Sequence, residues 1–261
     1  MSRAQVIAFV GASGGVGVSC LIAATAVRLA ESGRRVACLD RDACGGGLDV
    51  VFGLDHVRGV RWPEVLGARG ELDPSLLLAE LPHDRGVWVM SHGRDRLVTV
   101  SAEADETVLA ALAGGTDVVL IDAGRPVPVV DSGQRPTVVG VAGAAPEGGA
   151  RVGGVQGADD VVLVVDATPQ SLAAASAIAT AVPDSGAGPT WWLAQRVDRR
   201  STHLPETVQA ALDLPLAAVV GHDPKVSTAL LDGVVPGRRG ALSKAAAQLV
   251  QSLLQQGRRA A

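Results

Sequence analysis

The sequence predicts an α/β protein with a doubly wound, mostly parallel sheet and helices on both of its faces. Short apolar, β-branched runs alternate with helical patterns along the 261 residues. This alternation is typical of a parallel sheet whose crossover connections are helices and whose strands are buried on both faces. Because the length suits one large domain with a full core, we expect 1–261 to form a single domain.

The elements are expected in the following order. Strands are predicted at 5–10, 36–40, 87–90, 118–122, 161–166, 190–194 and 216–220. One helix follows the first strand and ends near Gly33, and four more are predicted at about 103–113, 170–182, 203–211 and 241–255. Between 124 and 157 the pattern gives way to Gly, Pro, Ala and Val over a longer stretch than most connections. We interpret 124–157 as a flexible Gly/Pro-rich insertion, with a binding loop as the alternative.

The turn after the first strand carries the main functional signal. It reads Gly11-Ala12-Ser13-Gly14-Gly15-Val16-Gly17-Val18-Ser19, which has the spacing of a P-loop but contains no lysine. A strand, a glycine turn and a helix N-terminus in this order point backbone N–H groups at an anion, so a phosphate site is predicted. The chain has only two lysines, Lys225 and Lys244, and both lie far downstream.

Composition argues against several classes of protein. No apolar run reaches the roughly 20 residues of a membrane span, and no signal-peptide pattern is seen, so we expect a soluble, cytoplasmic protein. The net charge of −4 gives no case for nucleic-acid binding. The three cysteines and five histidines have neither disulfide nor metal-ligand spacing, so we expect no metal cluster.

The glycine loop resembles that of the short-chain dehydrogenases, in which an acid such as Asp40 binds the ribose of a dinucleotide. The reaction of that family relies on a tyrosine, and this chain contains none. The resemblance therefore leaves a non-catalytic dinucleotide-binding module as one alternative.

The chain also resembles the MinD/ParA group of P-loop ATPases, and the likeness covers about residues 4–255. The shared segments are the loop frame 13–19, the Asp-x-Asp segment 39–42 with the turn at 47–53, the acidic strand 118–122, and 159–172 and 223–229. Segments 59–65 and 68–72 resemble the CpaE/TadZ-like, septum-site-determining branch of the group. The group usually carries Lys-Gly-Gly-x-Gly-Lys-Ser/Thr in its loop, so this Walker A motif is degenerate.

This resemblance implies a site for ATP and Mg²⁺. The nucleotide-binding residues it implies are Gly11, Ser13, Gly14, Gly15, Val16, Gly17, Val18, Ser19 and Cys20. Ser19, Asp40 and Asp122 would hold Mg²⁺, in part through water, and Asp42 with Asp40 would activate the attacking water if the protein hydrolyses ATP. In the group, the lysine at the Val18 position contacts the β- and γ-phosphates, and the lysine at the Ser13 position reaches the partner's nucleotide in a sandwich dimer. Where the group commonly places an asparagine that reads adenine, this chain has Gln195.

An arginine could replace the missing charge. The candidates stand beside predicted strand ends, and they are Arg41, Arg125, Arg196 and Arg199. If one of them does so, an active ParA/MinD-type ATPase becomes the second alternative.

We therefore expect a localisation or scaffolding protein with a degenerate ATP site and weak or absent hydrolysis. The resemblance implies a homodimer and protein partners in septum placement, pilus assembly or secretion. Those partners would recruit the cytoplasmic protein to a pole, a septum or a membrane machine. The apolar positions of the C-terminal helix could face the sheet or a membrane surface, and the absence of aromatic residues favours the sheet.

Overall fold

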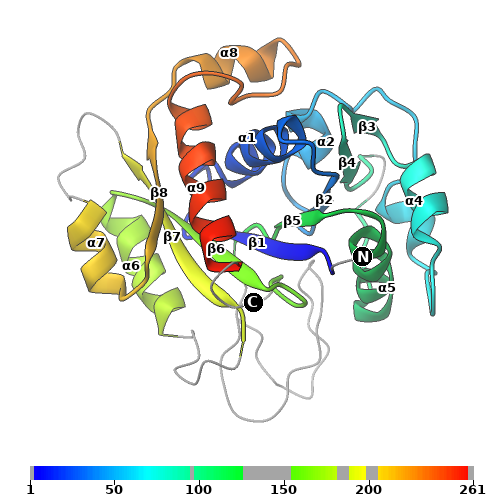
Figure 1. Cartoon of the computed structure of the whole chain (residues 1–261), viewed down its shortest axis with the longest axis horizontal. Coiled ribbons are helices and arrows are strands. Elements are labelled where there is room, and N and C mark those ends of the chain that lie inside the picture. The colour runs from blue at the N-terminus through cyan, green and yellow to red at the C-terminus, as the bar shows by residue number, and fades with distance from the viewer. Residues whose placement is uncertain (1–2, 95–96, 126–153, 181–187, 198–204, 258–261) are drawn as a thin grey trace.

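The computed structural model describes residues 3–94, 97–125, 154–180, 188–197 and 205–257, and these form an eight-stranded sheet covered by helices (Figure 1). The strand order is β3-β4-β2-β5-β1-β6-β7-β8, and in this described part of the chain only β3 and β4 pair antiparallel. The strands are β1 Gln5–Gly11, β2 Val36–Asp40, β3 His83–Asp84, β4 Val87–Met90, β5 Val118–Asp122, β6 Asp160–Asp166, β7 Thr190–Val197 and β8 Leu216–Gly221.

The helices form a layer on each face of the sheet, as the sequence predicts. Apolar residues of α1, α2 and α9 belong to one hydrophobic cluster, and those of α3 to α7 belong to the other. The helices are α1 Val18–Glu31, α2 Leu48–Val51, α3 Trp62–Val65, α4 Pro74–Glu80, α5 Ala102–Gly115, α6 Pro169–Ala179, α7 Pro205–Leu212, α8 Lys225–Leu231 and α9 Ala241–Gly257.

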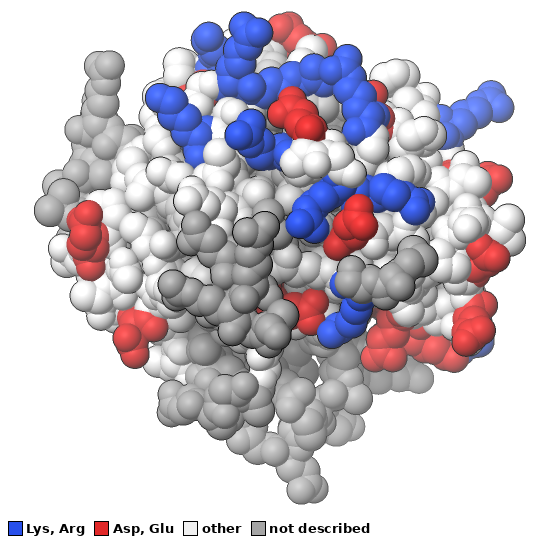
Figure 2. Space-filling model, viewed as in Figure 1, with Lys and Arg blue, Asp and Glu red and all other residues white. Residues whose placement is uncertain are grey.

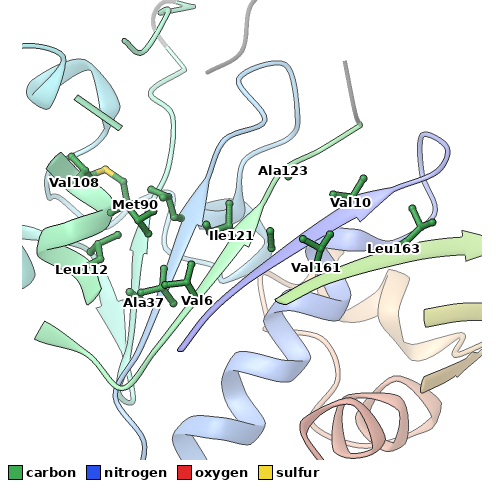
Figure 3. Close-up of a cluster of buried hydrophobic side chains, with 14 of the residues drawn as sticks. Val6, Val10, Ala37, Met90, Val108, Leu112, Ile121, Ala123, Val161 and Leu163 are labelled. Carbon is green, nitrogen blue, oxygen red and sulfur yellow. The ribbon is translucent and has the colours of Figure 1, made fainter. Parts of the chain in front are cut away.

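Each strand feeds both clusters because successive side chains point to opposite faces. In β1, Val6 and Val10 enter one cluster, while Ile7 and Phe9 enter the other. Figure 3 shows part of the cluster that contains Val6 and Val10, in which Val108 of α5 approaches the sheet. Because both faces of the sheet are buried, each central strand must be apolar along its whole length. Such continuous apolar runs are visible in the sequence, so the strands could be predicted.

The seven predicted strands and the five predicted helices are confirmed, with ends that move by a few residues. The sequence pattern does not reveal α2, α3, α4, α8 and β3, which have between two and seven residues each. Elements this short complete too few turns or alternations for a periodic pattern to appear. Of the predicted insertion 124–157, residues 126–153 lie outside the described residues, and so do residues 181 and 182 of the helix predicted at 170–182 and residues 203 and 204 of the helix predicted at 203–211.

The end of β2 is tied to α5 by a buried ion pair. Nε and Nη2 of Arg41 lie 2.9 and 2.6 Å from the two carboxylate oxygens of Asp105, and both side chains are almost fully buried. Nη1 of Arg41 donates to the carbonyls of Gly154 and Gln156. Because the guanidinium is so fully paired, loss of its partner would leave an uncompensated buried charge.

We predict that Asp105→Asn lowers the free energy of unfolding by about 3–5 kcal/mol, because Arg41 keeps its charge and loses its counterion. Urea denaturation measures the change. Glu106→Gln is the matched control, since Glu106 is the exposed neighbour on α5 and its neutralisation should leave stability nearly unchanged. Equal effects of the two substitutions would contradict the structural role of the pair.

Candidate functional site

Three neighbouring parallel strands end at the same edge of the sheet and carry the candidate site. In the order β2-β5-β1, Asp40 ends β2, Asp122 ends β5, and the glycine loop follows β1. Asp40 and Asp122 are register partners, and Phe9 of β1 is the partner of Asp122 on the other side. The carboxyl edge of an open α/β sheet is where such folds bind ligands.

The loop between β1 and α1 leaves backbone donors unused. Gly15 and Gly17 adopt φ angles of 74° and 97°, a left-handed conformation that favours glycine. Gly17 caps α1 without a side-chain hydrogen bond. The N–H groups of Gly17, Val18 and Ser19 have no hydrogen-bond partner among the described residues. A helix N-terminus with free N–H groups and no acidic residue in its first turn suits a phosphate group.

Ser19 and Asp122, two of the residues expected to hold Mg²⁺, contact each other directly at this edge. The hydroxyl of Ser19 donates to Oδ2 of Asp122 over 2.7 Å, and Oδ1 of Asp122 accepts from the N–H of Gly124. Burial raises the pKa of Asp122, and these two hydrogen bonds oppose the rise.

Asp40 is the second buried carboxylate of the site. Its Oδ2 accepts from the N–H of Leu48 and the hydroxyl of Ser91, and its Oδ1 accepts from the N–H of Asp42. Burial, followed by the neighbouring charge of Asp122, raises the pKa of Asp40 to about 7 despite these bonds. Asp40, Asp122 and Ser19 thus bring oxygen atoms to one edge of the sheet, and oxygen is the donor type that Mg²⁺ prefers.

Asp42 lies beside these groups on the turn that follows β2. Its Oδ1 accepts from the N–H of Cys44. A Cβ atom on Gly124 would lie 2.9 Å from the carboxyl carbon of Asp42, so Asp42 packs directly against the turn that follows Asp122. Its charge also contributes to the raised pKa of Asp122. The structure therefore gathers the three predicted acids at one edge.

The two positions at which the resemblance places lysines hold short side chains. Val18 is half-buried and packs against the core cluster of α1. The hydroxyl of Ser13 lies 3.3 Å from that of Ser171 in the first turn of α6. Of the other implied nucleotide-binding residues, Val16 is buried, and burial raises the pKa of the half-buried Cys20 thiol, which lies in the first turn of α1.

Among the candidate arginines, one contacts the loop. Nη1 of Arg196, near the end of β7, lies 3.3 Å from the carbonyl oxygen of Gly15. Arg41 is committed to Asp105, so it is not free to serve the loop. Arg125 is exposed just after β5, and Arg199 lies outside the described residues.

A second polar network adjoins the site and was missed from the sequence. The fully buried Asp49 accepts from Nε of Arg61 at 3.1 Å and from Nη2 of Arg94 at 2.6 Å. Burial acts to raise the pKa of Asp49, but Arg94 and Arg61 outweigh it and hold this pKa below its ordinary value. The Ser91 hydroxyl lies 3.0 Å from Asp40 and 3.2 Å from Asp49, and so links the network to the site. The sequence feature that could have revealed this network is an acidic residue, Asp49, within the otherwise apolar segment 48–52.

Two further findings concern the part of the chain that the structure describes. None of its helices has both the length and the apolar character needed to cross a bilayer. No group of three or more His, Cys, Asp or Glu side chains is arranged there to hold a metal ion.

Solved structures share this architecture over nearly the whole chain. The ParA family ATPase from Chlorobium tepidum TLS superposes with a TM-score of 0.74 at 19% identity and covers 94% of this chain and 96% of its own. The MinD cell division protein of Aquifex aeolicus has a TM-score of 0.70 at 20% identity, with 97% of each chain covered. The septum site-determining protein MinD of Pyrococcus horikoshii OT3, solved with Mg-ADP, has a TM-score of 0.69 at 19% identity, with 96% of each chain covered.

Relatives detected by sequence are more identical to this chain than these solved structures but match a smaller part of it. An uncharacterized protein of Mycobacterium tuberculosis is 33% identical over 114 residues, which cover 44% of this chain. The match spans only 31% of that relative's length. An uncharacterized ATP-binding protein of Methanocaldococcus jannaschii is 25% identical over 230 residues, covering 87% of this chain and 78% of its own. No protein-family model matches the chain.

The fold and the loop together define a doubly wound α/β protein of the P-loop type. More particularly, the chain has the fold of the MinD/ParA P-loop ATPases, as the sequence resemblance implied.

The raised pKa of Asp40 predicts a pH-dependent stability. A carboxyl group whose pKa is higher in the folded state holds its proton more tightly there, so its contribution is fullest below pH about 4 and is lost as pH rises through about 7. Asp122→Asn removes the neighbouring charge and should reduce this loss. Unfolding free energies at about pH 5 and about pH 8 give the comparison.

The matched control is Glu71→Gln, which neutralises an exposed acid and should leave the pH dependence as it is in the unmodified protein. A pH dependence that is the same in all three proteins would contradict the assignment to the Asp40–Asp122 pair.

Proposed function

We propose that the chain is a MinD/ParA-type localisation or scaffolding protein whose ATP site is degenerate. One observation carries the proposal. The phosphate loop keeps its free N–H groups and its Ser19–Asp122 contact, yet the position that would hold the phosphate-binding lysine holds the half-buried Val18. The binding scaffold is present, and the principal cation is replaced by an apolar side chain.

The retained groups favour binding over hydrolysis. Backbone N–H groups of the loop would hold the phosphates, and Ser19, Asp40 and Asp122 would hold Mg²⁺, which neutralises phosphate charge when bound. A charge-assisted hydrogen bond contributes roughly 1.5–3 kcal/mol, so loss of the lysine weakens binding by roughly tenfold to hundredfold. A cation aimed at the transferred phosphoryl group is worth about 10³–10⁵ in rate, so hydrolysis suffers more.

The cellular role rests on likeness to CpaE/TadZ-like proteins and to MinD. The Aquifex aeolicus MinD fold occurs in a MinC:MinD cell division complex, which supports a role exercised through protein partners. We propose a homodimer formed across the loop face, with partners in septum placement, pilus assembly or secretion. Such partners would bring the protein to a pole, a septum or a membrane machine.

Restoring the lysine tests the proposal. Val18→Lys should tighten Mg-ATP binding by about tenfold to hundredfold, as measured by calorimetry, because it returns the missing phosphate contact. Leu76→Lys is the matched control, since it adds the same charge at an exposed position on α4 and should change nothing. Fast turnover by the unmodified protein, abolished by Asp42→Ala, would instead refute degeneracy.

The contact between Arg196 and the loop favours a second candidate, an active ATPase in which this arginine replaces the lysine. The guanidinium already lies 3.3 Å from the Gly15 carbonyl. No carboxylate of the described residues forms an ion pair with it. An arginine with free N–H groups beside a phosphate loop can bind phosphate in a bidentate manner.

This candidate predicts measurable ATP turnover that Arg196→Ala lowers by about 10³-fold, because the transition state loses its cation. Phosphate release measures the rate. Arg125→Ala removes an exposed arginine from the same edge and should leave turnover unchanged. If both substitutions are silent, the arginine hypothesis fails and the degenerate site remains the better explanation.

A further inference from the structure

A groove lies at the end of α1 that is remote from the phosphate loop. It encloses about 270 Å³, and its apolar floor is formed by Val27, Ala30, Phe52, Val87 and Val235. These residues come from α1, from the residue after α2, from β4 and from the segment between α8 and α9. α1 has 14 residues, so its two ends are about 20 Å apart. The groove is therefore separate from the candidate nucleotide site.

Charged side chains line the rim of the groove, and further arginines adjoin it in the chain. Arg85 and Arg238 line it together with Glu31 and Asp84. Arg239 follows Arg238 in the chain, and Arg28 precedes Glu31 by three residues and so lies on the same side of α1. All four arginines are exposed, and in the described part of the chain only Arg85 has an ion-pair partner, Asp84 at 3.8 Å. Figure 2 shows Lys and Arg side chains gathered over this end of the molecule.

This local charge is opposite in sign to the net charge of the chain, which is −4. The lining itself holds two arginines and two acids, and the exposed Arg28 and Arg239 beside it in the chain give this end an excess of positive charge that attracts a negatively charged ligand.

Exposed apolar residues lie close in sequence to residues of the groove floor. Val234, next to Val235, is 49% exposed, and Leu231 at the end of α8 is 88% exposed. Val50, two residues before Phe52, is also exposed. No residue of α8 is buried. Apolar patches with a polar rim on a folded domain mark interaction surfaces.

We propose that this groove binds an amphipathic, acidic helix of a partner protein. Apolar side chains at helical spacing would enter the hollow between α1 and Val235, and acidic side chains on the flanks would pair with Arg238, Arg239 and Arg28. A concave floor fits inserted side chains better than the flat surface of a bilayer. The proposal goes beyond the proposed function, since it requires neither nucleotide nor a dimer.

The test uses a synthetic helix of about 18 residues with leucines on one face and glutamates elsewhere. Fluorescence anisotropy measures its binding to the full chain against a scrambled peptide of the same composition and a lysine-for-glutamate version. We expect the acidic amphipathic helix to bind and the other two not to bind. Arg238→Glu combined with Arg239→Glu should weaken binding by at least about tenfold and create affinity for the lysine peptide.

Ala30→Trp tests the groove itself. It fills the hollow without changing any charge, so it should abolish binding of the acidic peptide. Arg125→Glu, a reversal of an exposed charge away from the groove, is the control and should have no effect. Ser19→Ala should also leave peptide binding intact, which keeps this result independent of the nucleotide site.

Three outcomes would overturn the proposal: equal binding of the scrambled peptide, insensitivity to both the charge reversal and Ala30→Trp, or preferential binding to phosphatidylglycerol vesicles in competition with the peptide. The gain of binding to the lysine peptide shows that the charge-reversed variant is folded, and a thermal unfolding transition like that of the unmodified protein shows the same for Ala30→Trp, so a lost interaction cannot be mistaken for lost structure.

Discussion

The structure depends on the burial of two carboxylates, Asp40 and Asp122, at adjacent positions of neighbouring strands. Each is stabilised by hydrogen-bond donors rather than by a cation: Ser19 and a backbone N–H serve Asp122, while Ser91 and two backbone N–H groups serve Asp40. The nearby arginines are committed elsewhere, Arg41 to Asp105, and Arg61 and Arg94 to Asp49. The pKa values of both acids are raised, because burial disfavours the charged carboxylates more than these hydrogen bonds favour them. The turns after β2 and β5 and the start of α1 supply the hydrogen bonds that this pair accepts.

The strands and the gathering of acids were predictable for a common physical reason. A strand buried on both faces must be continuously apolar, and parallel strands place their carboxyl ends together, so acids at the ends of 36–40 and 118–122 converge. Contacts made by long side chains across the fold were not predictable. Arg94 reaches Asp49 across 45 residues of sequence, and Arg196 reaches Gly15 across 181. The local sequence determines neither of these partners. The sequence therefore offered four equivalent arginines that could replace the missing lysine, and only the fold shows that Arg196 contacts the loop.

A phosphate loop without lysine keeps most of its geometry because that geometry is carried by the backbone. Left-handed Gly15 and Gly17 and the uncapped start of α1 do not depend on the side chain at position 18. A valine there packs into the adjoining hydrophobic cluster, which a lysine would do only through its aliphatic stem. In the proposed site, valine in place of lysine lowers phosphate affinity and adds apolar burial, so the binding energy would come from the N–H groups and from Mg²⁺.

This balance limits how far nucleotide can control the protein. A ligand shifts a conformational equilibrium only by its difference in affinity for the two states, and a near-complete shift needs about 5.5 kcal/mol. In the proposed degenerate site the loop lacks a contact worth roughly 1.5–3 kcal/mol, and hydrogen bonds link Asp40 through Ser91 to Asp49. A groove some 20 Å away, on the last turn of the same helix, is open in the protein as it stands. Binding of a partner helix in this groove requires no conformational change driven by nucleotide. Such binding therefore suits the chain better than a cycle in which ATP binding and hydrolysis control partner binding.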